Sequence, residues 1–124
     1  MSEKACMIKV VGRTICIYPS QDVMRVIGKR YSLLLIGLLG NEGATSFNDI
    51  LANCAKPRPS LLSKRLEELQ ALGLIKREVV IDKPLRVRYS LTTKGAQLRE
   101  LLIPLFSWLE RPEMMTESAE RDKS

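Results

Sequence analysis

The chain has 124 residues, of which 45% are hydrophobic and 27% are charged, and its net charge is +6. This length and composition are typical of one globular domain with a single core. There is no histidine, and the three cysteines are widely separated, so neither a disulfide framework nor a zinc site within one subunit is expected. No secretory signal follows the first residues and no apolar run could span a bilayer, which favours a cytoplasmic protein with reduced thiols.

Residues 1–19 contain two runs that are typical of β-strands, at 7–11 and 14–18, and the pair Gly12-Arg13 separates them. A Gly-X pair between such runs predicts a β-hairpin with a type II′ turn. A hairpin on its own is only marginally stable in water. We therefore expect it to pack on the body of the domain or on a partner subunit.

Two helices are predicted next. The first begins at Ser20 and ends at Ile27, and it places Val23, Met24 and Ile27 on one side. The second covers residues 30–39 and ends at Gly40. It is apolar nearly all round, which indicates a position at the centre of the core.

A helix-turn-helix is predicted over residues 46–72. Ser46 and Asp49 have the spacing of an N-terminal capping box for a short helix over 47–53. Residues 55–58 form the turn, and a second helix follows over 59–72, with proline at its first position and glycine after its end.

The second of these helices is amphipathic. Leu62, Leu66 and Leu69 share one face, and the opposite face is polar and cationic near its N-terminal end, where Ser60, Ser63 and Lys64 lie. Such an outward face suits the major groove of duplex DNA. Any small α+β domain can also contain a helix that is polar on one side, so this stretch alone does not decide the function.

Two strands, at 74–81 and 86–91, follow and are joined by residues 82–85. In the second strand Val87, Tyr89 and Leu91 alternate with Arg86, Arg88 and Ser90, and we assign Tyr89 to the core. A basic hairpin after such a helix is the wing of a winged helix-turn-helix, a mostly α fold with a small β-hairpin. The expected phosphate contacts are Lys56 and Arg58 in the turn and Lys83, Arg86 and Arg88 in the wing.

The charge distribution supports this interpretation. Residues 56–94 carry 10 basic and 4 acidic residues, a net charge of +6, whereas residues 1–55 carry 6 and 4 and residues 95–124 carry 4 and 6. Enzymatic activity is not expected, because the chain has no histidine to act as a base and no glycine-rich phosphate loop. No cofactor or metal is predicted. A winged helix that serves only as a protein-interaction module is the alternative function.

A last helix is predicted to begin at Thr93, with Thr92 as its N-cap, and to end at Glu110. Its apolar residues cover most of the circumference, and a domain of this size cannot bury them all. We therefore expect a homodimer built on residues 93–110 with help from residues 20–27; the alternative is a monomer in which this helix docks on its own N-terminal segment. Pro104 removes one backbone hydrogen bond and should kink the helix. Residues 111–124 are expected to be disordered.

The chain resembles the HxlR-type winged helix-turn-helix transcriptional regulators, which have a MarR-like architecture, over residues 16–109. The residues that carry the resemblance are Gly28-Lys29, Phe47-Asn48-Asp49-Ile50, the segments 62–75 and 84–95, Pro104 and Trp108. It implies a dimeric DNA-binding regulator whose first and last helices make the dimer contacts. Family members also carry a cysteine ahead of the N-terminal proline, which some use to sense oxidants. Cys16, three residues before Pro19, is the candidate redox sensor; otherwise it is a half-buried strand residue.

Overall fold

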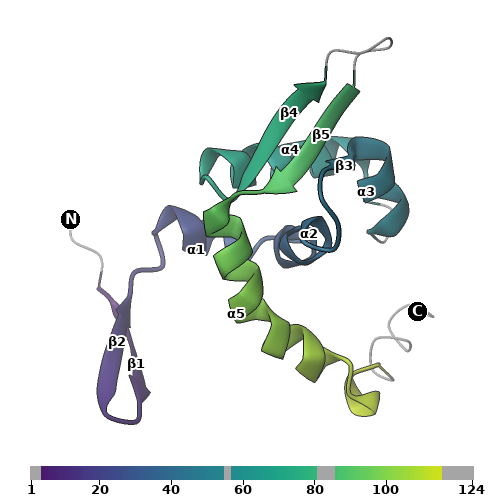
Figure 1. The fold of residues 1–124 in the computed structure, drawn as a ribbon. Coiled ribbons are helices and arrows are strands. Elements are labelled where there is room, and N and C mark those ends of the chain that lie inside the picture. The colour runs from purple at the N-terminus through teal and green to yellow at the C-terminus, as the bar shows by residue number, and fades with distance from the viewer. Residues whose placement is uncertain (1–3, 55–56, 81–85, 116–124) are drawn as a thin grey trace.

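The computed structural model describes residues 4–54, 57–80 and 86–115 (Figure 1). In chain order the elements are β1 (Cys6–Val10), β2 (Arg13–Ile17), α1 (Asp22–Ile27), α2 (Ser32–Leu39), β3 (Thr45–Ser46), α3 (Phe47–Asn53), α4 (Pro59–Ala71), β4 (Ile75–Val80), β5 (Arg86–Leu91) and α5 (Thr93–Leu109). This is a winged helix-turn-helix with an extra N-terminal hairpin, as predicted. None of the helices in the described part of the chain has the length and apolar character needed to cross a membrane.

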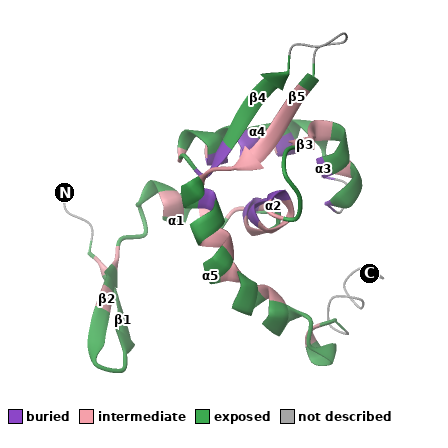
Figure 2. Ribbon diagram, viewed as in Figure 1, coloured by how far each residue is buried: buried purple, intermediate pink, exposed green. Residues whose placement is uncertain are grey.

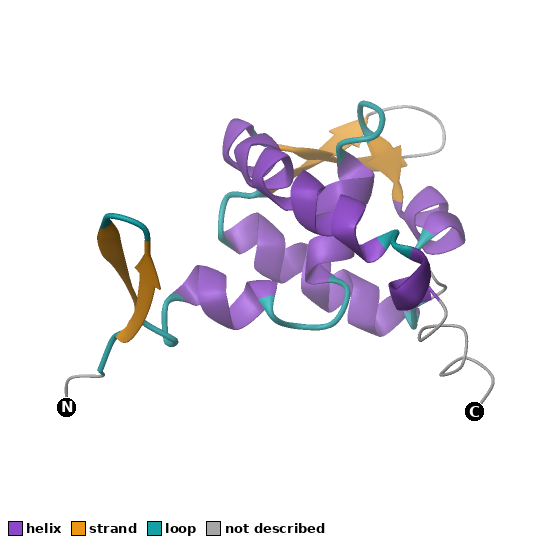
Figure 3. Ribbon diagram, turned by 90° about the horizontal axis from the view of Figure 1, so that it is seen from below, coloured by secondary structure: helices purple, strands orange, loops and turns teal. Residues whose placement is uncertain are grey.

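Two separate antiparallel sheets are present. β3, β5 and β4 form one sheet, with β5 in the middle, and it lies against the helices; β1 and β2 form the other, which stands apart from the body (Figures 1 and 3). Residues 112–115 form a further helical turn after α5, where the sequence predicted disorder. Residues 116–124 lie outside the described part.

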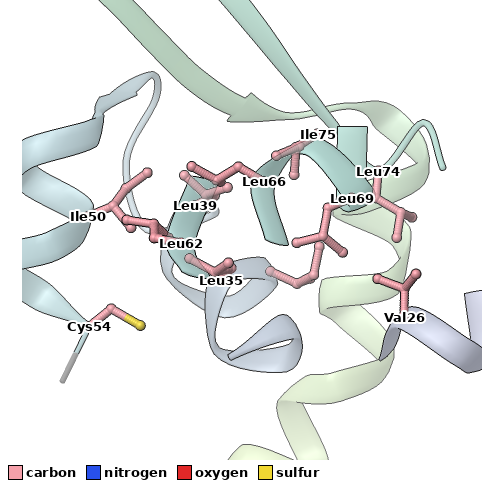
Figure 4. Packing of buried hydrophobic residues seen from close by; sticks show 11 residues of the cluster. Val26, Leu35, Leu39, Ile50, Cys54, Leu62, Leu66, Leu69, Leu74 and Ile75 are labelled. Carbon is pink, nitrogen blue, oxygen red and sulfur yellow. The ribbon is translucent and has the colours of Figure 1, made fainter. Parts of the chain in front are cut away.

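Helices α2 and α4 supply most of the core. Leu62, Leu66 and Leu69 on α4 are fully buried, as their spacing predicted, and they pack with Leu35 and Leu39 of α2 (Figure 4). Cys54, at the end of α3, and Ile75, at the start of β4, also belong to this cluster. Tyr89 packs against it from β5, which confirms its assignment to the core.

Side-chain caps fix the starts of α3 and α5. The Ser46 hydroxyl accepts a hydrogen bond from the Asp49 N–H at 3.2 Å, and the Thr92 hydroxyl accepts one from the Gly95 N–H at 3.1 Å. Both N-caps were predicted. Glycine is required at position 95, since a Cβ there would overlap the Leu74 carbonyl. The first turn of α5 can therefore lie directly against Leu74, the residue before β4.

The N-terminal hairpin differs from the sequence prediction at its turn. Val10 pairs with Arg13, so Val11 and Gly12 form the loop, and Gly12 has a φ of +86°. Positive φ at the second loop position alone is the pattern of a type II turn, and the predicted type II′ turn is wrong.

Helices α1 and α2 both begin two residues later than predicted. Tyr31 has a φ of +73°, a left-handed conformation that stops α2 from extending back to Arg30. In α1 the residue that enters the core is Val26, whereas Met24 is 43% exposed. The later start of α2 thus arises from the turn between these helices, which local periodicity does not describe.

That turn is tied to α4 by a cluster of charged residues. Arg65, only 9% exposed as a residue, donates from its side chain to the Arg30 carbonyl at 2.8 Å and to the Glu68 carboxylate at 2.7 Å. Glu68 also accepts a hydrogen bond from Lys29. That bond holds the pKa of the Glu68 carboxyl below its ordinary value of 4.5; partial burial opposes the shift and Arg65 adds to it.

We predict that Glu68→Ala lowers the free energy of unfolding by about 1.5–3 kcal/mol, since it leaves the Arg65 guanidinium without its carboxylate. The folded-state pKa of Glu68 is depressed, so its contribution is present above pH 4.5 and is lost as the pH falls through the lower folded value. Denaturant unfolding at several pH values would measure this. Glu67→Ala, on the exposed face of the same helix, is the control and should change stability by less than about 0.5 kcal/mol. Equal effects of the two substitutions would contradict the role given to the cluster.

Candidate nucleic-acid interface

The N-terminal end of α4 presents a polar and basic surface. Arg58 occupies the N-cap position in an extended conformation and its side chain makes no capping hydrogen bond. Arg58, Ser60, Ser63 and Lys64 are all exposed. The first N–H groups of a helix have no intrahelical acceptor and carry partial positive charge, so this end attracts anions.

The burial of the opposite face fixes which residues of α4 face outward. Leu62, Arg65, Leu66 and Leu69 are its buried residues, and Figure 2 shows that side of the helix turned into the body. Arg65 was counted with the basic surplus of residues 56–94, but it lies inside. Lys94 also has an internal partner, because its ammonium donates to the Leu72 carbonyl at 3.1 Å. The basic surface is therefore smaller than the sequence count indicated.

The two arginines of β5 that the sequence placed in the wing lie in different places. Arg86 is exposed at the start of β5, at the outer end of the wing. Arg88 is half-buried and its guanidinium lies 3.4 Å from the Ala44 carbonyl, next to β3. Arg88 thus adjoins α3 rather than α4. Lys56 and Lys83 lie outside the described residues.

A cleft runs between α4 and the root of the wing. Its lining residues are Ser63, Leu66, Glu67, Gln70, Arg77 and Tyr89. Arg77 is paired with Tyr89 across the sheet, so the two side chains share the face that is turned toward α4. Sequence reasoning missed both Arg77 and Gln70. The alternation of Ile75, Arg77 and Val79 along β4 was the signal that could have found Arg77.

The three cysteines have different environments. Cys16 is exposed on β2, and its thiol lies 3.2 Å from the Met7 sulfur on the opposite strand, so the half-buried alternative is wrong. Cys6 is also exposed. Cys54 is buried, and burial raises the pKa of its thiol, which disfavours the reactive thiolate.

The outer side of α5 is apolar and uncovered. Leu98, Leu102 and Phe106 face the body and are half-buried. Leu101, Leu105 and Trp108 have the i, i+4, i+7 spacing of one helical stripe and are 77%, 36% and 45% exposed. We call these three residues the α5 stripe. The N-terminal hairpin does not cover it, because the hairpin stands away from α5 (Figures 1 and 3).

The chain also matches known proteins. A family model described as HxlR-like helix-turn-helix matches residues 26–117, which is more than half of the chain. The protein belongs to this family. Its members are helix-turn-helix transcriptional regulators and not enzymes, which agrees with the prediction that this chain has no catalytic site.

Individual relatives agree with this membership. YvaP of Bacillus subtilis (strain 168), an uncharacterized HTH-type transcriptional regulator, is 36% identical over 88 residues, which are 71% of this chain and 81% of YvaP. The crystal structure of a possible HxlR family transcriptional factor from Thermoplasma volcanium GSS1 is also similar. It matches over 86% of this chain and 94% of the other chain, with a TM-score of 0.77 and 33% identity. The structure of the redox regulator HypR in its oxidized form matches over 74% of this chain and 94% of the HypR chain, with a TM-score of 0.67 and 30% identity.

Proposed function

We propose that this protein regulates transcription as a homodimer that binds specific sites in duplex DNA through α4 and the wing. The observation that carries the proposal is the division of α4. Its apolar face and Arg65 are locked into the body, and Ser60, Ser63 and Lys64 are left exposed next to the positive helix end. An exposed helix of this kind can enter a major groove, where side chains reach base edges.

The proposed contacts divide into two kinds. Ser60, Ser63 and Lys64 face the base edges and adjacent phosphates, and Gln70 and Arg77 lie beside them along the cleft. Arg58, Arg86 and Arg88 contact the phosphate backbone. Lys56 and Lys83, predicted from the sequence, are proposed as further phosphate contacts.

The α5 stripe supports the homodimer. Burial of apolar surface contributes about 25 cal/mol for every Å² removed from water, so a second copy that covers this surface is favoured. Met24, exposed on α1, is the apolar residue that the segment 20–27 has available for the same interface. A two-fold pair buries the same patch on both copies and presents two α4 helices to one face of the duplex. The preferred site is then an inverted repeat with half-sites ~34 Å apart, or a multiple of that distance.

Cys16 is proposed as a redox sensor on two grounds. Its thiol is exposed in the hairpin that precedes α1, where an oxidant can reach it. HypR, a relative of similar fold, is a redox regulator by name. Oxidation of Cys16 would then change the affinity of the dimer for DNA.

We predict that Lys64→Ala weakens specific DNA binding by about 1–3 kcal/mol if Lys64 contacts a base, and that it lowers the salt slope by about 1 if the contact is a phosphate. Lys76→Ala is the control, because Lys76 lies on the sheet face away from α4 and pairs with Glu78 at 3.4 Å. Fluorescence anisotropy over a salt series would measure both. Affinity that hardly depends on salt, in the wild type, would instead favour a protein-interaction module.

We predict that Trp108→Glu dissociates the dimer and abolishes specific binding, because it places a charge within the α5 stripe. Ser107→Glu adds the same charge to the neighbouring position outside the stripe and should leave the dimer intact. Sedimentation velocity at micromolar concentration measures the assembly, and circular dichroism checks that the helices persist. A wild-type monomer, or selection of a single asymmetric half-site from random DNA, would contradict the homodimer.

We predict that oxidants release the wild-type protein from DNA and that Cys16→Ser retains binding under the same treatment. Cys6→Ser is the control, with each variant compared with its own untreated binding, since Cys6 is the other thiol of the same hairpin and is exposed in the single subunit. Gel-shift titrations with hydrogen peroxide before and after reduction measure the effect, because peroxide oxidises a single thiol to a sulfenic acid and is itself reduced to water. Release that is unchanged by Cys16→Ser, or no release from the wild type, removes Cys16 from this role.

A further inference from the structure

The two faces of the β1–β2 hairpin differ in chemistry. Directly paired residues of an antiparallel hairpin point to the same face, and successive pairs alternate between faces. The pairs Cys6–Ile17, Ile8–Ile15 and Val10–Arg13 therefore share one face. The other face holds the pairs Met7–Cys16 and Lys9–Thr14. We call the first the apolar face, since Arg13, next to the turn, is its only charged residue.

The apolar face is not covered by its own chain. Ile8 is 50% exposed and Val10 is 44% exposed. Within the described residues, neither the buried core nor the hydrophobic side chains packed against it include any residue of the hairpin. Figures 1 and 3 show the hairpin separated from the helices in both views. A two-stranded hairpin is marginal alone and needs packing against another element, so this face requires a partner.

The hairpin and the distal half of α5 both extend from the body on the side away from the wing, the hairpin at the left of Figure 1 and α5 toward the lower right. Five residues of a strand span ~17 Å, and three turns of helix span ~16 Å. The apolar face thus has the length needed to cover the outer part of one α5 helix.

The charges of the two surfaces are also complementary. In the described part of the hairpin region the charged side chains are Lys4, Lys9 and Arg13, all of them basic. Residues 100–115 carry Glu100, Glu110 and Glu113 against Arg111, a net charge of −2. Opposite charges at the rim of an apolar contact favour the correct pairing over others.

We infer that the β1–β2 hairpin is a dimerisation arm whose apolar face packs on the outer part of α5 in a second copy of this chain. The inference rests on the proposed homodimer and adds an element to it. The α5 helix of one subunit lies between α5 and the hairpin of its partner. Two-fold symmetry repeats this contact, so each subunit both extends an arm and receives one.

The face on which Cys16 lies stays outside this contact. Cys16 and Met7 share the other side of the hairpin, so the arm can dock while the thiol remains accessible. The hairpin that carries the Cys16 thiol thus also takes part in dimer formation. A modification of Cys16 therefore acts on an element of the dimer.

The test compares two neighbouring substitutions on opposite faces of β2. Ile15→Lys places a charge in the apolar face, and Thr14→Lys places the same charge on the other face. We expect Ile15→Lys to raise the dimer dissociation constant about tenfold or more, which corresponds to the burial of a single side chain. Thr14→Lys should leave it within about twofold of the wild type, as expected for an exposed residue. Sedimentation equilibrium of the full chain measures both.

Hydrogen exchange supplies a second readout that does not depend on a variant. Amides of β1 and β2 should exchange more slowly as the wild-type concentration rises through the dimer dissociation constant. Equal dissociation constants for Ile15→Lys, Thr14→Lys and a dimeric wild type would overturn the arm and leave the proposed dimer standing. Equal weakening by both lysines would also overturn it, since the effect would then not depend on the face. A wild type that stays monomeric would defeat the dimer and the arm together.

Discussion

The proposed DNA-binding surface depends on the contacts of the buried Arg65 guanidinium. This group joins α4 to the Arg30 carbonyl in the turn between α1 and α2, and Glu68 and Lys29 complete the cluster. A buried charge without partners costs several kcal/mol, so this geometry holds α4 in one rotation about its axis. With that rotation fixed, Ser60, Ser63 and Lys64 must face outward.

The two proposed interfaces lie at opposite ends of the molecule. The wing extends from one side of the core, and the distal half of α5 and the N-terminal hairpin extend from the other (Figure 1). The segregation follows from the sequence, because the basic surplus falls within residues 56–94 and most of the exposed large apolar residues fall near the two ends of the chain. A dimer built on the second end leaves both α4 helices free to meet the same duplex.

Local patterns in the sequence predicted most of the fold, and contacts between distant residues account for what they missed. The 3.6-residue period predicted the buried leucines of α4, and cap residues predicted the starts of α3 and α5. A step of about 100° per residue also places Arg65 between Leu69 and Leu72, yet its partner, the Arg30 carbonyl, is 35 residues away and leaves no local signal. Arg77 was missed because its importance comes from strand register, and the turn at Val11 and Gly12 was misassigned for the same reason.

Helix α1 connects the two ends of the molecule. Residues 18–21 join it to the hairpin, where the Gln21 N–H donates to the Tyr18 carbonyl at 3.1 Å, and Val26 anchors it in the core. The turn after it carries Lys29 and Arg30, which contact Glu68 and Arg65 on α4. One short helix and one charged cluster therefore connect the hairpin to α4.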